Sequence, residues 1–304
     1  MENAENSYKA GFVAVLGRPN VGKSTLINAM LGQKVAAVSP RPQTTRKRQM
    51  GILSLPAGQV VFIDTPGVHK PHHKLGESMN REAASTLQEA DVALLIVDAS
   101  QAPHAEDQML ADLLRRSNTR AAPILALNKA DLVSAEELPA RSAAYQALIP
   151  LAEVRPISAL RNEGLDRLLE LILSHLGQGE AYFPDGQVTD LYEREIAADL
   201  IREAALNILR DEVPHGMAVR IDQFLERGEE GAYIEATLFV EKESHKPIVI
   251  GQGGAMLKKI GSAARKEIET MSGRRVYLQL RVKVRKNWRD DERVLRSFGF
   301  SSKE

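Results

Sequence analysis

The stretch Gly17-Arg18-Pro19-Asn20-Val21-Gly22-Lys23-Ser24 decides how the first half of this chain folds. It has the spacing G-x-x-x-x-G-K-S and stands between the apolar run Phe12 to Leu16 and a helix expected over Thr25 to Leu31. In such a strand, loop and helix, backbone N–H groups at the helix start surround the phosphates of a nucleotide. Lys23 would reach the terminal phosphate oxygens, and the hydroxyl of Ser24 would be a ligand of Mg²⁺. A glycine turn beside a surface lysine, the simpler alternative, is disfavoured by this context.

Apolar runs recur from Gly11 to about His175 and are separated by longer amphipathic segments. The runs are Phe12 to Leu16, Val60 to Ile63, Val92 to Val97, Pro123 to Leu127 and Val154 to Ile157. Continuous apolar strands suit a sheet that is covered on both faces, and segments such as Leu75 to Gln88 have the spacing of covering helices. The pattern predicts an α/β fold, with a mostly parallel sheet and helices on both faces.

Length and composition limit the possible classes of protein. The chain has 304 residues, of which 43% are hydrophobic and 26% charged, which is typical of a globular protein of two domains. No apolar run approaches the roughly 18 residues that a membrane helix requires. The first ten residues lack the features of a secretory signal, and the chain has no cysteine, which excludes disulfides, thiolate catalysis and Cys-bound zinc. We expect a cytoplasmic protein.

A domain boundary is expected at Gly177 to Asp190, where glycines and a proline interrupt the alternation. We predict a nucleotide-binding domain over residues 1–178, a linker over 179–190 and a second domain over 191–304. The second domain should contain a helix over Glu193 to Arg210, strands over Ala218 to Leu225 and Tyr233 to Lys242 joined by a turn at Arg227 to Gly231, a helix over Met256 to Met271 and a strand over Arg275 to Lys286. This order predicts a compact α+β domain.

Further motifs follow other strands of the first domain. Asp64-Thr65-Pro66-Gly67 ends the second apolar run, where a carboxylate can hold Mg²⁺ through water and the Gly67 amide can contact a γ-phosphate. Asn128-Lys129-Ala130-Asp131 ends a later run, and its aspartate can accept hydrogen bonds from guanine that adenine does not offer. GTP and GDP are therefore the predicted ligands, rather than the nucleotides of a kinase or an ATPase. The predicted nucleotide contacts are Gly17, Asn20, Val21, Gly22, Lys23, Ser24, Thr25, Asp64, Gly67, Asn128, Lys129, Asp131, Ser158 and Ala159.

The polar segment Pro40 to Arg46 lies between the first helix and the second apolar run. One of its threonines is expected to bind Mg²⁺ in the GTP state, and Thr45 is preferred over Thr44. The predicted Mg²⁺ ligands are therefore Ser24, Thr45 and Asp64. An ordinary surface loop is the alternative interpretation.

These motifs resemble those of the TrmE-Era-EngA group of GTPases. The resemblance is carried by Gly17 to Ser24 with Asn20, by Thr44 to Arg46, by Asp64 to Gly67 and by Asn128 to Asp131. It implies slow GTP hydrolysis, because Val68 stands where Ras-like proteins place the glutamine that orients the attacking water. It also implies that Asn20 coordinates K⁺, as an asparagine does in some relatives. The implied catalytic residues are Asn20, Lys23, Thr45 and Gly67.

Gly251-Gln252-Gly253-Gly254 resembles the GXXG loop of a KH domain, a module that binds single-stranded nucleic acid. The segment Lys242 to Arg289 carries thirteen Lys or Arg against three Glu, which favours an anionic partner. Single-stranded RNA is the predicted ligand, and the alternatives are anionic lipid or a solvated basic face. The predicted RNA contacts are Ile250, Gly251, Gln252, Gly253, Gly254, Lys258, Lys259, Arg281 and Lys283. We expect Ile248, Ile250, Met256 and Ile260 to line the groove beside the loop, unless they belong to the core.

From end to end the chain resembles members of that group with a C-terminal type II KH domain, through Leu191 to Glu195, Ile248 to Gly261 and Trp288 to Phe300. The resemblance implies binding near the 3′ end of small-subunit ribosomal RNA during maturation of the small ribosomal subunit, with peripheral contact to the inner membrane in some relatives. Many relatives carry a positive residue at Gln252, so one backbone contact should be missing. We expect a monomer. Two alternatives stay open, namely a constitutive RNA-binding module and a regulatory GTPase that acts on protein or membrane partners with a non-selective basic C-terminal domain.

Overall fold

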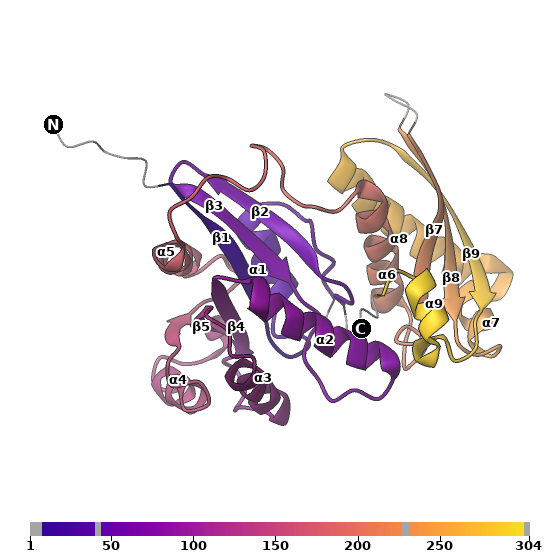
Figure 1. The fold of residues 1–304 in the computed structure, drawn as a ribbon. Helices are drawn as coiled ribbons and strands as arrows, with labels where there is room; N and C mark the ends of the chain where they lie inside the picture. The colour runs from indigo at the N-terminus through magenta and orange to yellow at the C-terminus, as the bar shows by residue number, and fades with distance from the viewer. Residues whose placement is uncertain (1–7, 40–43, 227–230, 301–304) are drawn as a thin grey trace. The chain divides into compact units, whose positions relative to one another are not determined.

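A six-stranded sheet forms the first of two compact units, in the order β2-β3-β1-β4-β5-β6 (Figure 1). The protein is described by a computed structural model that covers residues 8–39, 44–226 and 231–300. Neighbouring strands pair in parallel except β2, which is antiparallel to β3. The strands are β1 (Lys9–Leu16), β2 (Gln49–Leu55), β3 (Gly58–Asp64), β4 (Val92–Asp98), β5 (Ala122–Asn128) and β6 (Glu153–Pro156). The predicted mostly parallel sheet is confirmed, and β2 adds an antiparallel edge that no predicted run covered.

Helices cover both faces of this sheet, because successive residues of a strand point to opposite sides. Helices α1 and α5 share a core with Val13 and Val15, whereas α2, α3 and α4 share a core with Ala14 and Leu16 on the other face. The helices are α1 (Lys23–Leu31), α2 (Lys74–Glu89), α3 (Ala105–Arg116), α4 (Leu138–Gln146) and α5 (Leu165–His175). Every residue of β3 and β4 is buried, as the continuous apolar runs predicted.

The segment from residue 179 to 190, predicted to be a linker, is hydrogen-bonded along the first unit. Gln59 Oε1 accepts hydrogen bonds from the backbone N–H groups of Tyr182 and Phe183, at 2.8 and 3.0 Å. The N–H of Ile52 donates to the carbonyl of Val188 at 2.9 Å. These residues therefore extend the first unit as far as Asp190, and the second unit is built mainly from Leu191 onward.

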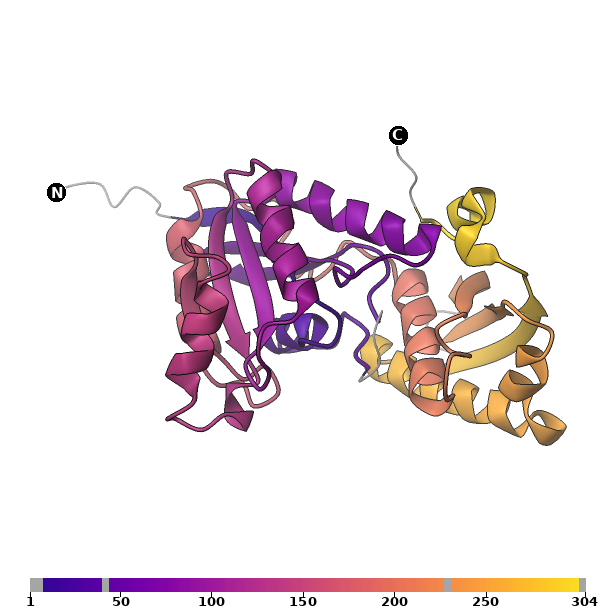
Figure 2. The same cartoon turned by 90° about the horizontal axis from the view of Figure 1, so that it is seen from below.

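A three-stranded sheet in the order β7-β8-β9 forms the second unit, with β7 antiparallel and β9 parallel to β8. Helices α6 and α8 pack against one face of it (Figure 2). The elements are α6 (Glu193–Ile208), β7 (Ala218–Glu226), β8 (Ala232–Val240), α7 (His245–Ile250), the 3₁₀ turn Gln252–Gly254, α8 (Ala255–Ser272), β9 (Val276–Val284), the 3₁₀ turn Trp288–Asp290 and α9 (Glu292–Ser297). The predicted α+β order is confirmed, although residues 227–230 of the expected turn lie outside the described chain.

Trp288 anchors the C-terminal segment of the second unit. Its side chain is fully buried, its indole N–H donates to the carbonyl of Gly216 at 2.9 Å, and its ring lies edge-on to Phe298 at 5.4 Å between centroids. Trp288 is therefore part of the interior of this unit, and its ring is not available to stack on a base. None of the helices in the described residues is long and apolar enough to cross a membrane.

Candidate nucleotide and nucleic-acid sites

The loop between β1 and α1 approaches the ends of neighbouring strands so closely that only glycine fits at two positions. Gly22 has φ 101°, and a Cβ placed there would lie 2.3 Å from Nδ2 of Asn128. A Cβ on Gly17 would lie 2.5 Å from the carbonyl oxygen of Ile96. Asn20 lies exposed in the same loop with φ 66°. The loop therefore has the compact backbone that the predicted phosphate contacts require.

Lys23 is held over this loop by hydrogen bonds to its backbone. Its ammonium donates to the carbonyl oxygens of Gly17 at 3.2 Å and Arg18 at 3.1 Å, and the residue is only 6% exposed. Burial lowers the pKa of Lys23 to about 8, with Asp64 opposing this shift and the charge of Arg18 adding to it. The ammonium is therefore still protonated at neutral pH and close to where phosphate oxygens would enter.

The three predicted Mg²⁺ ligands converge beside Lys23, although they lie far apart in the sequence. The hydroxyls of Ser24 and Thr45 are 3.0 Å apart, and each donates to Oδ2 of Asp64 at 2.9 Å. Asp64 is 1% exposed and Thr45 5% exposed. Two hydroxyls and a carboxylate are oxygen donors of the kind that Mg²⁺ prefers, so the residues present fit this ion. Residues 40–43 of the predicted Mg²⁺-binding segment lie outside the described chain.

The segment after Asp64 is attached to the phosphate loop. The N–H of Val68 donates to the carbonyl of Gly17 at 3.2 Å, and a Cβ on Gly67 would lie 2.8 Å from the backbone nitrogen of Pro19. The side chain of Val68 is 3% exposed and belongs to the hydrophobic core. Val68 therefore offers backbone groups to the site, and its side chain has no atom that could accept a proton.

Asn128 joins the phosphate loop to the predicted base pocket. Its amide donates to the carbonyl of Val21 at 2.7 Å, and its Oδ1 accepts from the N–H of Ala159 at 2.9 Å. Both contacts are buried, since Asn128 is 3% exposed, and Ser158 beside Ala159 is 1% exposed. One buried amide thus holds three separate segments of the predicted site together.

Asp131, the predicted guanine-selective carboxylate, has a side chain that is only 6% exposed and lies 3.3 Å from Nε of Arg161. The preceding Lys129 has a left-handed backbone with φ 61°, and its ammonium is 2.6 Å from Oδ2 of Asp98. Neither Arg161 nor Asp98 belongs to the residues that the sequence predicted. Asp98 could have been found, because it ends the apolar run Val92 to Val97 just as Asp64 ends its own run.

A charged network behind the phosphate loop was also missed by sequence reasoning. One guanidinium nitrogen of Arg18 donates to Oε1 of Gln101 at 2.8 Å, and Nε lies 3.5 Å from Oδ2 of Asp107. The same guanidinium approaches Asp98 at 4.0 Å. Burial raises the pKa of Asp107, against the lowering effects of a hydrogen bond from the His104 backbone and the charge of Arg18. The network connects the phosphate loop with the ammonium of Lys129 through Asp98.

The glycine-rich turn of the second unit exposes its backbone at the start of α8. Gly251, Gly253 and Gly254 have φ of 73°, 58° and 83°, which favours glycine at each position. A Cβ on Gly253 or Gly254 would meet no atom within 4 Å, so a ligand backbone can approach here. Gln252 and Lys259 are exposed beside it, and Ile250 ends the preceding helix α7. The loop thus has the accessible geometry that the predicted RNA contacts need.

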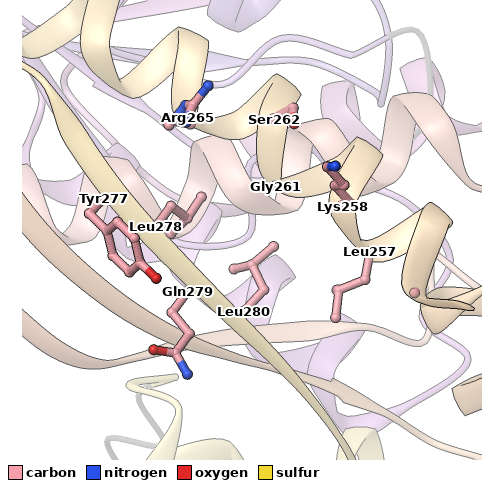
Figure 3. Close-up of a pocket in the computed structure, with 10 residues that line it drawn as sticks. Leu257, Lys258, Gly261, Ser262, Arg265, Tyr277, Leu278, Gln279 and Leu280 are labelled. Atoms are coloured by element: carbon pink, nitrogen blue, oxygen red, sulfur yellow. The ribbon is translucent and has the colours of Figure 1, made fainter.

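A groove of about 420 Å³ continues from this turn between α8 and β9. Figure 3 shows its lining, which comes from the helix on one side and from the strand on the other. The lining residues are Gly254, Leu257, Lys258, Gly261, Ser262, Arg265, Tyr277, Leu278, Gln279 and Leu280. None of the four apolar residues expected beside the loop lines this groove, and Ile260 and Met256 instead belong to the core, as the alternative interpretation allowed.

Two predicted RNA contacts lie on a different surface. Arg281 and Lys283 alternate along β9 with Leu280 and Val282, which pack against the core under the helices. Their side chains therefore belong to the opposite face of the sheet, where Arg281 lies 3.2 Å from Glu235. Of the predicted RNA contacts, only Gly254 and Lys258 are among the residues that line the groove.

Comparison with known proteins finds a matching family for each of the two units. A family described as "50S ribosome-binding GTPase" matches residues 12–129, and a family described as "KH domain" matches residues 212–289. The chain is 46% identical to the GTPase Era of Heliobacterium modesticaldum over 296 residues, which covers 97% of this chain and 98% of the relative. It is also 46% identical to the GTPase Era of Geobacter metallireducens over 299 residues, with 98% and 100% covered.

A solved structure shares the whole fold. It is a crystal structure of Era in complex with MgGDPNP and nucleotides 1506–1542 of 16S ribosomal RNA, with a TM-score of 0.91 and 39% identity. The match covers 97% of this chain and 99% of that one, so both units have counterparts in the same order. At this identity and coverage, the chain belongs to the Era family of GTPases.

Proposed function

We propose that this protein is a GTP-hydrolysing switch that binds single-stranded ribosomal RNA through its KH domain. The observation that carries the GTPase function is the convergence of Ser24, Thr45 and Asp64, with hydroxyl and carboxylate oxygens within 3.0 Å of one another. Lys23 begins α1 beside them and donates to the phosphate loop, and Asn128 connects that loop with the base pocket. GTP, GDP and Mg²⁺ are therefore the ligands of this site. We assign the domains to residues 1–178 and 191–304, joined by residues 179–190, which are hydrogen-bonded along the first unit.

Hydrolysis moves the γ-phosphoryl group of GTP to water, and this chain contributes positioning and electrostatics. Lys23 is already oriented by two carbonyl oxygens, so little reorganisation is needed when it contacts phosphate. When bound, Mg²⁺ neutralises charge on the phosphate oxygens, and Ser24, Thr45 and Asp64 would hold it directly or through water. Val68 offers no proton acceptor beside them, which agrees with slow intrinsic turnover. A K⁺ ion at Asn20 stays a prediction.

The contacts of Thr45 and Gly67 explain how GTP could act as a signal. Thr45 is bonded to both other Mg²⁺ ligands, and the backbone after Gly67 is bonded to the phosphate loop. A γ-phosphate that engages both segments would hold them in place, and its loss would release them. We infer that this change alters access of RNA to the KH domain.

The KH domain supplies the RNA-binding function. Its groove combines an exposed glycine backbone, the apolar side chains of Leu257 and Leu280, and the cations Lys258 and Arg265. These features suit a single strand, whose phosphates pass the glycines while its bases enter the groove. By analogy with the relative solved with nucleotides 1506–1542 of 16S ribosomal RNA, we propose the 3′ end of small-subunit ribosomal RNA as the ligand, in maturation of that subunit. A monomeric state, a cytoplasmic location and peripheral membrane contact stay predictions.

The test compares the affinity of the full chain for an RNA of nucleotides 1506–1542 of 16S ribosomal RNA, with Mg²⁺ and either GDP or MgGDPNP. A scrambled RNA is the control. We expect tighter, sequence-selective binding with MgGDPNP than with GDP, and a log-log salt slope of about −0.7 per phosphate neutralised. Equal binding in both states would reduce the protein to a constitutive RNA-binding module.

The double variant Gly253→Asp and Gly254→Asp tests the remaining alternative, a regulatory GTPase whose basic C-terminal domain is non-selective. It places two carboxylates where the RNA backbone must approach, and beyond the neighbouring residues no atom lies within 4 Å of either Cβ position. Asp also tolerates the left-handed backbone of these positions better than most residues do. RNA binding should collapse while GTP hydrolysis is retained. Unchanged RNA affinity in this variant would favour the regulatory GTPase with a non-selective basic domain.

A further inference from the structure

Two tyrosines stack on the face of the KH sheet opposite to α6 and α8. Tyr233 of β8 and Tyr277 of β9 are partners in register, with ring centroids 5.5 Å apart and ring planes inclined by 10°. Their neighbours Ile234 and Leu278 point the other way, into the core under the helices. Tyr277 is 65% exposed, which is unusual for so large a ring. Packing in the core therefore does not explain this pair.

Tyr277 also borders the groove described above. Strand β9 is the edge strand of its sheet, and Tyr277 and Gln279 line the groove together with Lys258 and Arg265 of α8 (Figure 3). The groove and the outer face of the sheet therefore meet along the edge of β9. Because Tyr233 stacks against one face of the Tyr277 ring and the side chain remains largely exposed, the ring still offers aromatic surface to solvent at this edge.

Hydrogen bonds hold Tyr233 in place behind Tyr277. The Tyr233 hydroxyl donates to Oε1 of Glu235 at 2.6 Å and lies 3.0 Å from Oε1 of Gln279. Glu235 is in turn 3.2 Å from the guanidinium of Arg281, whose side chain is 53% exposed. The surface thus combines a supported aromatic ring with a cation that phosphate can reach, as proteins that bind single strands do.

We propose that Tyr277, supported by Tyr233, is a stacking site for a nucleobase of the RNA strand just outside the nucleotides clamped by the glycine-rich turn. The proposal rests on the RNA-binding function proposed above and adds a contact at the outer edge of the groove. The strand leaves the groove over the edge of β9, one base stacks on the Tyr277 ring, and Arg281 neutralises a neighbouring phosphate. Stacking tolerates any base, so this contact adds affinity and register rather than sequence selectivity.

The experiment measures affinity by fluorescence anisotropy for the full chain with Mg²⁺ and MgGDPNP. Two single-stranded RNAs are compared, one of four nucleotides from the clamped segment and one that extends it by several nucleotides on both sides. Tyr277→Ala should weaken binding of the long RNA by roughly tenfold, since one base–aromatic stack contributes about that factor. Binding of the short RNA should change by less than about threefold. Tyr277→Phe keeps the ring and should bind both RNAs like the wild type.

Tyr192→Ala is the matched control, because Tyr192 is 80% exposed in the same unit but lies outside the groove and the tyrosine pair. The melting temperatures of all variants should stay within a few degrees of the wild type. Unchanged affinity of Tyr277→Ala for the long RNA overturns the proposal, and so does an equal loss for both RNAs. Failure of the wild type to bind either RNA would instead refute the RNA-binding function itself.

Discussion

Replacing Asp98 with Asn should weaken the binding of both GDP and GTP. Asp98 ends β4 with a carboxylate that is 2% exposed and accepts hydrogen bonds from the ammonium of Lys129 and the hydroxyl of Ser100, both at 2.6 Å. Burial acts to raise the pKa of Asp98, but these hydrogen bonds and the charge of Lys129 outweigh it and hold the pKa below its ordinary value. The carboxylate is therefore ionised and orients Lys129 beside the predicted base pocket.

The size of the effect follows from the hydrogen bond that is lost. Asn has the shape of Asp, but its one amide oxygen would stay with the Ser100 N–H and hydroxyl donors, and its NH₂ group would then face the Lys129 ammonium. The hydrogen bond to Lys129, worth about 1.5–3 kcal/mol for a charged group, is therefore lost. The Lys129 side chain is 34% exposed and can return to water, which places the loss at the lower end of that range. About 1.5 kcal/mol corresponds to roughly a tenfold increase in Kd.

The assay titrates fluorescent GDP and GTP analogues into the purified protein. Asp112→Asn is the control, since it makes the same chemical change on α3 in a side chain that is 41% exposed and paired with Arg115. The control should bind nucleotide like the wild type. If Asp98→Asn binds GDP within twofold of the wild type, the positioning role of Asp98 is wrong. If Asp98→Asn lowered the melting temperature but left the Kd for nucleotide unchanged, Asp98 would have only a structural role.

Three further predictions concern the nucleotide site. Gly22→Ala should reduce GDP affinity by two orders of magnitude or more, because its Cβ would displace the buried amide of Asn128. Gly32→Ala is the control, since Gly32 has φ 66° but no atom near its Cβ, and it should change stability alone. Calorimetric titration measures the GDP affinity of both variants, and thermal melting measures their stability. Thr45→Ala should lower kcat at high Mg²⁺ with little effect on GDP affinity, and its control Thr44→Ala should lower kcat far less. If a phosphate-release assay showed similar losses of kcat in the two variants, the assignment of Thr45 as a Mg²⁺ ligand would be contradicted. Turnover should be faster in K⁺ than in Na⁺ at equal ionic strength, and equal rates would rule out a role for K⁺.

The nucleotide site was largely predictable because its residues come at the ends of parallel strands. Each strand end carries its own short motif, and parallel strands bring those ends to one edge of the sheet. Asp64 and Asn128 were located by such motifs at the ends of apolar runs, and the structure brings both to the phosphate loop. Asp98 follows the same rule but was missed, because a lone aspartate carries no recognisable motif.

The RNA-binding surface was less predictable, because it depends on which face of a strand each side chain occupies. The GXXG resemblance located the turn, and the charge excess indicated an anionic partner. Arg281 and Lys283 were predicted as RNA contacts from their charge, but only the alternation along β9 shows that they lie on the face of the sheet opposite to α6 and α8. Tyr277 was not considered, since an aromatic residue in a strand is more often part of a core.

The sequence by itself determined the class of fold, the order of the two domains, the guanine nucleotide as ligand and the kind of partner for the basic domain. These conclusions rest on short motifs and periodic patterns, which local chemistry is enough to interpret. The tertiary structure alone decided which residues meet across long stretches of chain, such as Lys129 with Asp98 and Tyr233 with Tyr277. Such pairs depend on strand order and register, which are set by the packing of the whole unit and not by any one segment.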